Sequence, residues 1–226
     1  MPMQSRVQGY VVIHAIYLHG FASSAQSSKA NFFRTRLASR GVNVVTPDLN
    51  EPDFSTLTVT RMLDQVQGAI AALPAGPVAL IGSSLGGFVA VNAALRAPER
   101  IDRLVLLAPA LDFDGNRLRD LGDRGIDEWQ RTNRLDVFHY GFGRLMPLHY
   151  GLYEDAARYD PFDARIDLPI QIFQGLGDTA VDPLTVQRWA AARPNVELHL
   201  LDDDHQLHAS LETIWAETAR FLGVRP

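Results

Sequence analysis

The sequence contains no cysteine among its 226 residues. Without thiols there is no disulfide framework, no thiolate metal site and no cysteine nucleophile, so serine, histidine and carboxylates are left to carry any chemistry. The net charge of -5 comes from acids scattered along the chain, and no run of Lys or Arg could follow a phosphate backbone. We therefore expect no nucleic-acid partner.

Long hydrophobic runs are also missing. No stretch approaches the roughly 18 apolar residues that a membrane-spanning helix needs. The early apolar stretch 10–18 is interrupted by His14, follows a single Arg and precedes no small-residue cleavage site. It therefore predicts a buried strand and not a signal peptide, and we expect a soluble, cytoplasmic protein.

The overall composition is that of a globular domain. Hydrophobic residues make up 46% of the chain and charged residues 21%, and there is no internal repeat or low-complexity tract. A single core can grow to about 250 residues before chains divide. The sequence therefore predicts one domain over residues 1–226.

Short apolar runs alternate with longer amphipathic stretches, a rhythm typical of crossover units on a parallel sheet. The apolar runs predict strands at 11–18, 42–46, 77–81, 103–108, 169–174 and 196–201. The amphipathic stretches predict helices at 27–40, 56–73, 85–97, 184–193 and 207–222. Because the strand residues are continuously apolar, both faces of the sheet should be covered. The predicted fold class is α/β, with a mostly parallel sheet and helices on both faces.

The rhythm stops between about 112 and 166, where strand and helix signals give way to Gly, Asp, Arg and aromatic residues. This is too long for an ordinary connection. The part from 113 to 162 holds nine of the twenty aromatics, which argues against disorder. We interpret the region 112–166 as an inserted lid or cap that folds over the edge of the sheet.

Ser84 is the candidate nucleophile. It lies in the pattern Gly-Ser-Ser-Leu-Gly, directly after a predicted strand and before a predicted helix, which is the context of a nucleophile elbow. The turn is sharp enough that a side chain at Gly82 or Gly86 should clash. The alternatives are an ordinary Gly/Ser turn between core elements, or Ser83 as nucleophile in a shifted register.

Two backbone amides are candidate donors to an oxyanion. Where a nucleophile elbow follows a strand of a parallel sheet, one donor comes from the loop after an earlier strand, here His19-Gly20-Phe21 after the first strong strand. The other is the backbone amide of the residue after the nucleophile. We assign them to Phe21 and Leu85. The alternative is that Gly20 only ends the strand and His19 is a hydrogen-bonded loop residue.

An acid and a base follow later strands. Asp178 comes after the strand 169–174, and we expect it to orient the base. Asp182 is a rival in the same loop, although its place before Pro183 also suits a helix cap.

His205 follows the strand 196–201 and is the candidate base. His208 is the alternative, and we expect it in the opening turn of the last helix. The adjacent Asp202, Asp203 and Asp204 could raise the pKa of the histidine or simply form a solvated loop and helix cap.

The candidates occur in the order Ser, Asp, His, which is the order of α/β-hydrolases. Each also falls at the carboxyl end of a predicted strand, where open α/β sheets bind their ligands. With these features the sequence resembles the α/β-hydrolases over nearly its whole length, and its elbow is similar to that of small bacterial esterases of the YqiA-like group. The motifs that carry the resemblance are His19-Gly20-Phe21, Gly82-Ser83-Ser84-Leu85-Gly86-Gly87, Gly177-Asp178 and His205.

The resemblance implies cofactor-independent hydrolysis of a small-molecule ester or thioester through an acyl-enzyme. The aromatic lid suggests an apolar acyl or aryl group in the substrate. The alternatives are a peptidase, an amidase or a carbon–carbon bond hydrolase with the same triad, or a binding protein that keeps only the fold. His139 and His149 have no carboxylate at ligand spacing, so we expect no metal.

Overall fold

The computed structural model describes residues 14–113 and 121–225. Its main feature is a six-stranded sheet with the strand order β2-β1-β3-β4-β7-β8, in which every neighbouring pair is parallel. The strands are β1 (His14–Leu18), β2 (Asn43–Val45), β3 (Val78–Ser83), β4 (Ile101–Leu107), β7 (Ile170–Gly175) and β8 (Val196–Leu201). The predicted mostly parallel α/β fold is confirmed.

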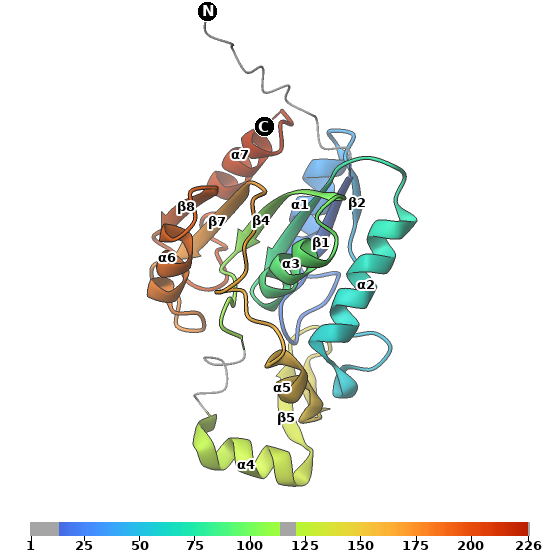
Figure 1. Ribbon diagram of the computed structural model, residues 1–226, viewed down its shortest axis with the longest axis vertical. Helices are drawn as coiled ribbons and strands as arrows, with labels where there is room; N and C mark the ends of the chain where they lie inside the picture. The colour runs from blue at the N-terminus through green and yellow to red at the C-terminus, as the bar shows by residue number, and fades with distance from the viewer. Residues whose placement is uncertain (1–13, 114–120, 226) are drawn as a thin grey trace, which may run out of the picture.

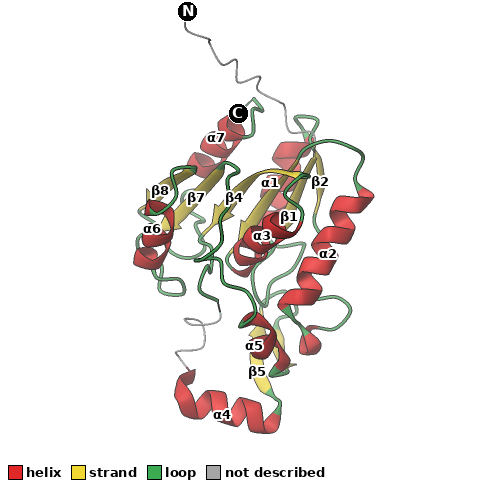
Figure 2. Ribbon diagram, in the orientation of Figure 1, coloured by secondary structure: helices red, strands yellow, loops and turns green. Residues whose placement is uncertain are grey.

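Helices cover both faces of the sheet (Figure 2). One buried cluster joins the sheet to α2 (Val59–Ala72), α3 (Leu85–Arg96) and α6 (Pro183–Ala191). A second cluster joins the opposite face to α1 (Ser28–Ala38) and α7 (Leu211–Phe221). Because both faces are covered, every residue of β3 and β7 is buried, which explains their continuously apolar sequence.

The predicted elements match the structure closely, apart from their ends. All six strands are present, although residues 11–13 of the first prediction lie outside the described residues. The predicted helix 56–73 is divided into a short 3-10 helix, Phe54–Thr56, and α2. The last helix begins at Leu211, so the expectation that His208 opens it was wrong. Leu207 adopts a left-handed φ of 56°, which prevents the chain from continuing as a right-handed helix from that point.

The region predicted as a lid contains regular structure that the sequence did not indicate. It forms α4 (Gly122–Thr132), an antiparallel hairpin of β5 (Leu135–His139) and β6 (Arg144–Leu148), and α5 (Gly151–Ala156). These elements gather at one end of the molecule, the end opposite the C-terminus (Figure 1). Trp129, Leu148 and Leu152 join the buried cluster beneath α2 and α3. Residues 114–120 lie outside the described residues, and the role of the region as a lid stays a prediction.

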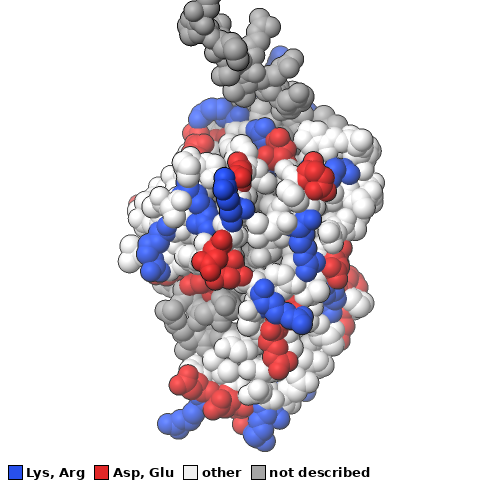
Figure 3. Space-filling model, viewed as in Figure 1, with Lys and Arg blue, Asp and Glu red and all other residues white. Residues whose placement is uncertain are grey.

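The surface carries charges of both signs. On the face shown in Figure 3, acidic and basic side chains are interspersed. Within residues 14–113 and 121–225, none of the helices has the length and apolar character needed to cross a bilayer. The expected cytoplasmic location and the absence of a nucleic-acid partner stay predictions.

Candidate functional site

The structure brings together the three residues that the sequence selected. Ser84 directly follows β3, Asp178 follows β7 and His205 follows β8, so all three lie at the carboxyl edge of the parallel sheet. The His205 ring lies between the other two: its Nε2 is 3.1 Å from Ser84 Oγ and its Nδ1 is 2.8 Å from Asp178 Oδ2. In the neutral ring Nδ1–H donates to the carboxylate, which leaves Nε2 free to accept the serine proton.

The backbone at Ser84 makes a sharp turn. Its φ of 52° and ψ of -117° are unusual for a residue with a side chain, and such strain is typical of functional sites. A Cβ atom on Gly82 would lie 2.3 Å from the Gly86 oxygen, and one on Gly86 would lie 2.1 Å from the Leu18 oxygen. The predicted clash at both glycines is therefore confirmed. The Ser84 amide donates to the Leu107 oxygen at 2.9 Å, which fixes the turn against β4.

Asp178 is held by hydrogen bonds on both of its oxygens. Oδ1 accepts from the backbone amides of Ala180 and Val181, each at 2.8 Å, and Oδ2 accepts from Gln174 Nε2 at 2.9 Å in addition to His205. Burial alone would raise the pKa of Asp178, but these hydrogen bonds, led by the one from His205, hold it below its ordinary value. The carboxylate is thus kept ionised and correctly oriented.

The loop that carries His205 is fastened to the end of β7. The Gly177 amide donates to the Asp203 oxygen at 3.0 Å, and a Cβ atom on Gly175 would lie 2.5 Å from the same oxygen. The side chain of Asp203 accepts from the Ser210 amide at 2.8 Å, and that of Asp204 accepts from the Gln206 amide at 2.7 Å. Both aspartates therefore organise the loop, as one of the two sequence interpretations had it.

The rival residues are engaged elsewhere. Asp182 caps α6, where its carboxylate accepts from the Leu184 amide at 3.0 Å. His208 is exposed, and its Nε2 lies 3.3 Å from Ser28 Oγ. Ser83 ends β3, and its side chain hydrogen-bonds to Tyr17. Each of the three thus has a structural partner outside the Ser84, His205 and Asp178 chain.

The loop expected to supply an oxyanion donor passes beside the serine. A Cβ atom on Gly20 would lie 3.3 Å from Ser84 Cβ and 4.0 Å from its Oγ, which leaves no room for a side chain without adjustment. His19 supports this loop, because its Nε2 accepts from the Leu49 amide at 2.9 Å and its Nδ1 donates to the Gly20 oxygen at 2.9 Å. Leu85 begins α3, and helix N-termini favour a developing negative charge.

An apolar cavity of about 170 Å³ opens next to this loop. Its walls come from the loop after β1, the chain after β4 and the region predicted as a lid. The ten described residues that line it are all aliphatic or aromatic: Phe21, Phe113, Leu121, Trp129, Leu135, Val137, Leu148, Leu152, Tyr153 and Ala156. The Phe21 ring packs against Phe113, with ring centroids 6.3 Å apart. Phe21 thus belongs both to the loop beside Ser84 and to the cavity wall.

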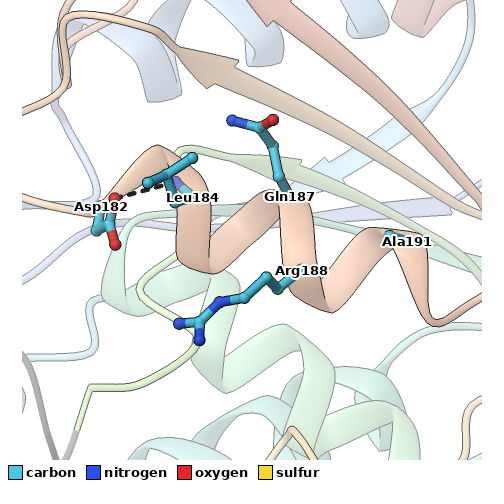
Figure 4. Close-up of a pocket in the computed structure, with 5 residues that line it drawn as sticks. All are labelled: Asp182, Leu184, Gln187, Arg188 and Ala191. Atoms are coloured by element: carbon cyan, nitrogen blue, oxygen red, sulfur yellow. Dashed lines mark hydrogen bonds between the residues drawn. The ribbon is translucent and has the colours of Figure 1, made fainter.

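A second hollow lies along α6 and shares no residue with this cavity. It is lined by Asp182, Leu184, Gln187, Arg188 and Ala191, which all belong to one helix and its cap (Figure 4). The dashed line in Figure 4 is the hydrogen bond by which Asp182 caps the helix. None of the three residues joined at Ser84 lines this hollow.

Two residues that the sequence did not single out support the acid. Gln174 is fully buried and donates to Asp178; the only sequence signal was a polar residue at the end of an apolar strand. Lys29, in the first turn of α1, is also buried. Burial lowers the pKa of Lys29 to about 8, although Asp178, Asp204 and Asp203 attract its charge. No local pattern in the sequence indicated this position.

The parallel sheet, the helices on both faces and the strained serine after β3 define an α/β-hydrolase. The chain belongs to the family described as Uncharacterised protein family (UPF0227), whose model matches residues 14–221. The resemblance seen in the sequence is thus confirmed at the level of the superfamily and of the YqiA-like group.

Known proteins with similar sequence or structure agree with this assignment. The chain is 36% identical to lipase LipV of Mycobacterium tuberculosis over 86 residues, which are 36% of this chain and 33% of the lipase, so the match spans only a third of that relative. A protein of Agrobacterium vitis S4, provisionally described as a hydrolase, superposes with a TM-score of 0.82 at 24% identity over 92% of this chain and 87% of its own. Est1E of Butyrivibrio proteoclasticus superposes with a TM-score of 0.75 at 19% identity over 93% and 87%.

Proposed function

We propose that the protein is a serine esterase that cleaves carboxylic esters or thioesters through an acyl-enzyme. Ser84 is the nucleophile, His205 the general base and Asp178 the residue that orients the base. The observation that carries the proposal is the continuous hydrogen-bond chain, 2.8 Å from Asp178 to His205 and 3.1 Å from His205 to Ser84. A serine hydroxyl becomes a useful nucleophile when a positioned base can take its proton.

The reaction follows from the positions of these groups. His205 Nε2 takes the proton of Ser84 Oγ as the oxygen attacks the carbonyl carbon, and the Phe21 and Leu85 amides stabilise the resulting oxyanion. The imidazolium then gives its proton to the leaving alcohol or thiol, which departs as the acyl-enzyme forms. Water, deprotonated by His205, attacks the acyl-enzyme and releases the acid and the free serine. No cofactor is needed.

The apolar cavity beside Phe21 is the proposed site for the acyl group. A cavity of about 150 Å³ lined by apolar side chains is known to hold a benzene molecule. The cavity here, about 170 Å³, therefore fits an acyl chain of about four to six carbons or a phenyl ring. Because no charged side chain lines it among residues 14–113 and 121–225, a charged acyl group would lose its hydration without gaining a partner there.

The experiment is a series of p-nitrophenyl esters with acetyl, butyryl, hexanoyl, benzoyl and succinyl groups. We expect kcat/KM to be highest for the butyryl, hexanoyl and benzoyl esters, and lowest for the charged succinyl ester. Replacing Ser84 with alanine should lower kcat at least about 10⁴-fold in a folded protein. Ser83→Ala, one position earlier, is the matched control and should keep most of the activity.

The result separates the esterase from the other possibilities. An anilide and a dione of the same acyl groups are assayed in parallel, and turnover of either with no ester hydrolysis would replace the proposal by an amidase or a carbon–carbon bond hydrolase. A folded protein that cleaves none of the three substrate classes would contradict it. Equal rates across the acyl series would contradict the assignment of the cavity.

A further inference from the structure

A second group of potential ligands lies on the sheet face covered by α7, away from Ser84. Glu197 and His199 are two residues apart on the edge strand β8, so their side chains point to the same face of the sheet. Glu217, on α7, approaches the same face. One ligand atom from each of these three residues lies within 4.8 Å of the other two. Two carboxylates and an imidazole are a ligand set suited to a divalent transition metal.

A buried amide is directed at the same point. Gln171, on β7, is 1% exposed, and its partner in the parallel register is Glu197. Its Nε2 lies 3.3 Å from His199 Nε2, while its Oε1 has no hydrogen-bond partner within residues 14–113 and 121–225. A buried amide oxygen without a partner is costly, and native structures rarely leave one.

The hydrogen bonds around His199 Nε2 are mutually incompatible. This nitrogen lies 2.8 Å from Glu197 Oε1, which can only accept, and 3.3 Å from Gln171 Nε2, which can only donate. If Nε2 carries the proton, it can donate to the carboxylate, but its N–H then faces the N–H of the amide. If Nε2 is bare, it can accept from the amide, but its lone pair then faces the carboxylate oxygen. Rotating the amide by half a turn would direct Oε1 at the cluster. In the tautomer with its proton on Nδ1, the bare Nε2 and the oxygens of Gln171 and Glu197 would then face one point.

We propose that Glu197, His199, Glu217 and the amide oxygen of Gln171 bind a divalent cation of the zinc type. Ligands at about 2.1 Å from a tetrahedral ion are about 3.4 Å apart, so the present separations of up to 4.8 Å close with small side-chain movements. The imidazole favours zinc over magnesium, calcium and manganese, which prefer oxygen ligands. The stack of His199 on Phe173, with ring centroids 4.8 Å apart, orients the ring.

The site joins the two elements on either side of the catalytic loop. β8 precedes residues 202–210 and α7 follows them, and this loop carries His205. A metal ion bound by both elements would therefore fasten the edge strand to the last helix. Arg220 pairs with Glu217. Because Arg220 is well exposed, the pair is easily displaced by a divalent ion.

The test is a calorimetric titration of the full-length protein with zinc chloride, followed by thermal unfolding with and without zinc. We expect one ion per chain, and a rise in Tm of about 5–10 °C at free zinc about 100-fold above Kd. Mutating a residue that only hydrogen-bonds to a metal ligand lowers metal affinity about 10–100-fold. Loss of a ligand itself, in His199→Gln or Glu217→Gln, should therefore weaken zinc binding by at least the same factor. Magnesium should bind far more weakly than zinc.

Two further substitutions separate a metal site from a polar contact. Gln171→Glu should tighten zinc binding because it adds a charged oxygen, and Arg220→Gln should tighten it because it removes the competing cation. Glu212→Gln changes the same charge on the same helix, and His149→Gln removes a histidine outside the cluster, so both controls should leave the affinity unchanged. Absence of zinc binding, or binding that survives both His199→Gln and Glu217→Gln, would overturn the proposal. Glu217 is partly exposed, so its variant serves if His199→Gln fails to fold.

Discussion

Replacing Lys29 with methionine is expected to stabilise the protein at neutral pH. Burial lowers the pKa of Lys29 from 10.5 to about 8. In the unfolded chain the amine therefore keeps its proton up to about pH 10.5, whereas in the fold it loses the proton near pH 8. At pH 7 the ammonium is retained in both states, and the gap of about 2.5 between the two pKa values corresponds to about 3 kcal/mol of destabilisation.

Methionine has a similar apolar stem and no charge, so Lys29→Met should raise the free energy of unfolding by up to about 3 kcal/mol at pH 7. Between pH 8 and pH 10.5 the unfolded state binds more protons than the fold, and the stability of the wild type therefore rises with pH. The advantage of the variant should accordingly shrink to about 1 kcal/mol at pH 10. Urea unfolding at pH 7 and pH 10 measures both quantities.

Lys29→Arg is the matched control, because a guanidinium stays protonated at both pH values. The stability of this variant should therefore not rise between pH 7 and pH 10 as that of the wild type does. The reasoning is refuted if Lys29→Met is no more stable than the wild type at pH 7. It is also refuted if the difference between the two proteins is the same at pH 7 and pH 10, since the destabilisation would then not come from the buried charge.

Three further predictions concern the surroundings of the serine. Gly86→Ala should lose at least about 3 kcal/mol of stability or fail to fold, because its Cβ would lie 2.1 Å from the Leu18 oxygen. The control Gly68→Ala lies in open space on α2 and should gain about 0.5–1 kcal/mol. Calorimetry measures both changes. Gln174→Leu should lower kcat about 10-fold with KM unchanged, and an unchanged kcat would show that its bond to the carboxylate does not position the base. His208→Ala should keep near-wild-type ester hydrolysis, and a large loss would favour it as the base.

Much of the fold could be predicted from the sequence because its signals are local. A run such as Val78-Ala79-Leu80-Ile81 is continuously apolar because both faces of the strand are covered. The glycines around Ser84 follow from the backbone contacts of the turn. Residues that end parallel strands come to one edge of the sheet, so Asp178 and His205 could be placed near Ser84 from strand order alone.

Other features depend on contacts that no local pattern encodes. The helix α4 is mostly polar, has Gly125 in its interior and buries only Trp129, and the hairpin strands β5 and β6 are five residues each, so the sequence showed no apolar run to mark them as elements. Lys29 comes within electrostatic range of Asp178 because α1 packs against the sheet, and Gln171 lies beside His199 because β7 pairs with β8. These neighbours are set by the tertiary fold and not by spacing along the chain.

The central claim is that Ser84 is a nucleophile activated by His205, and covalent labelling tests it most directly. The folded protein is treated with a fluorophosphonate, digested and analysed by mass spectrometry. We predict one phosphonyl group on Ser84, no labelling of Ser84→Ala, unchanged labelling of Ser83→Ala and much slower labelling of His205→Gln. Labelling of another residue, or none in a protein that folds normally, would contradict the claim.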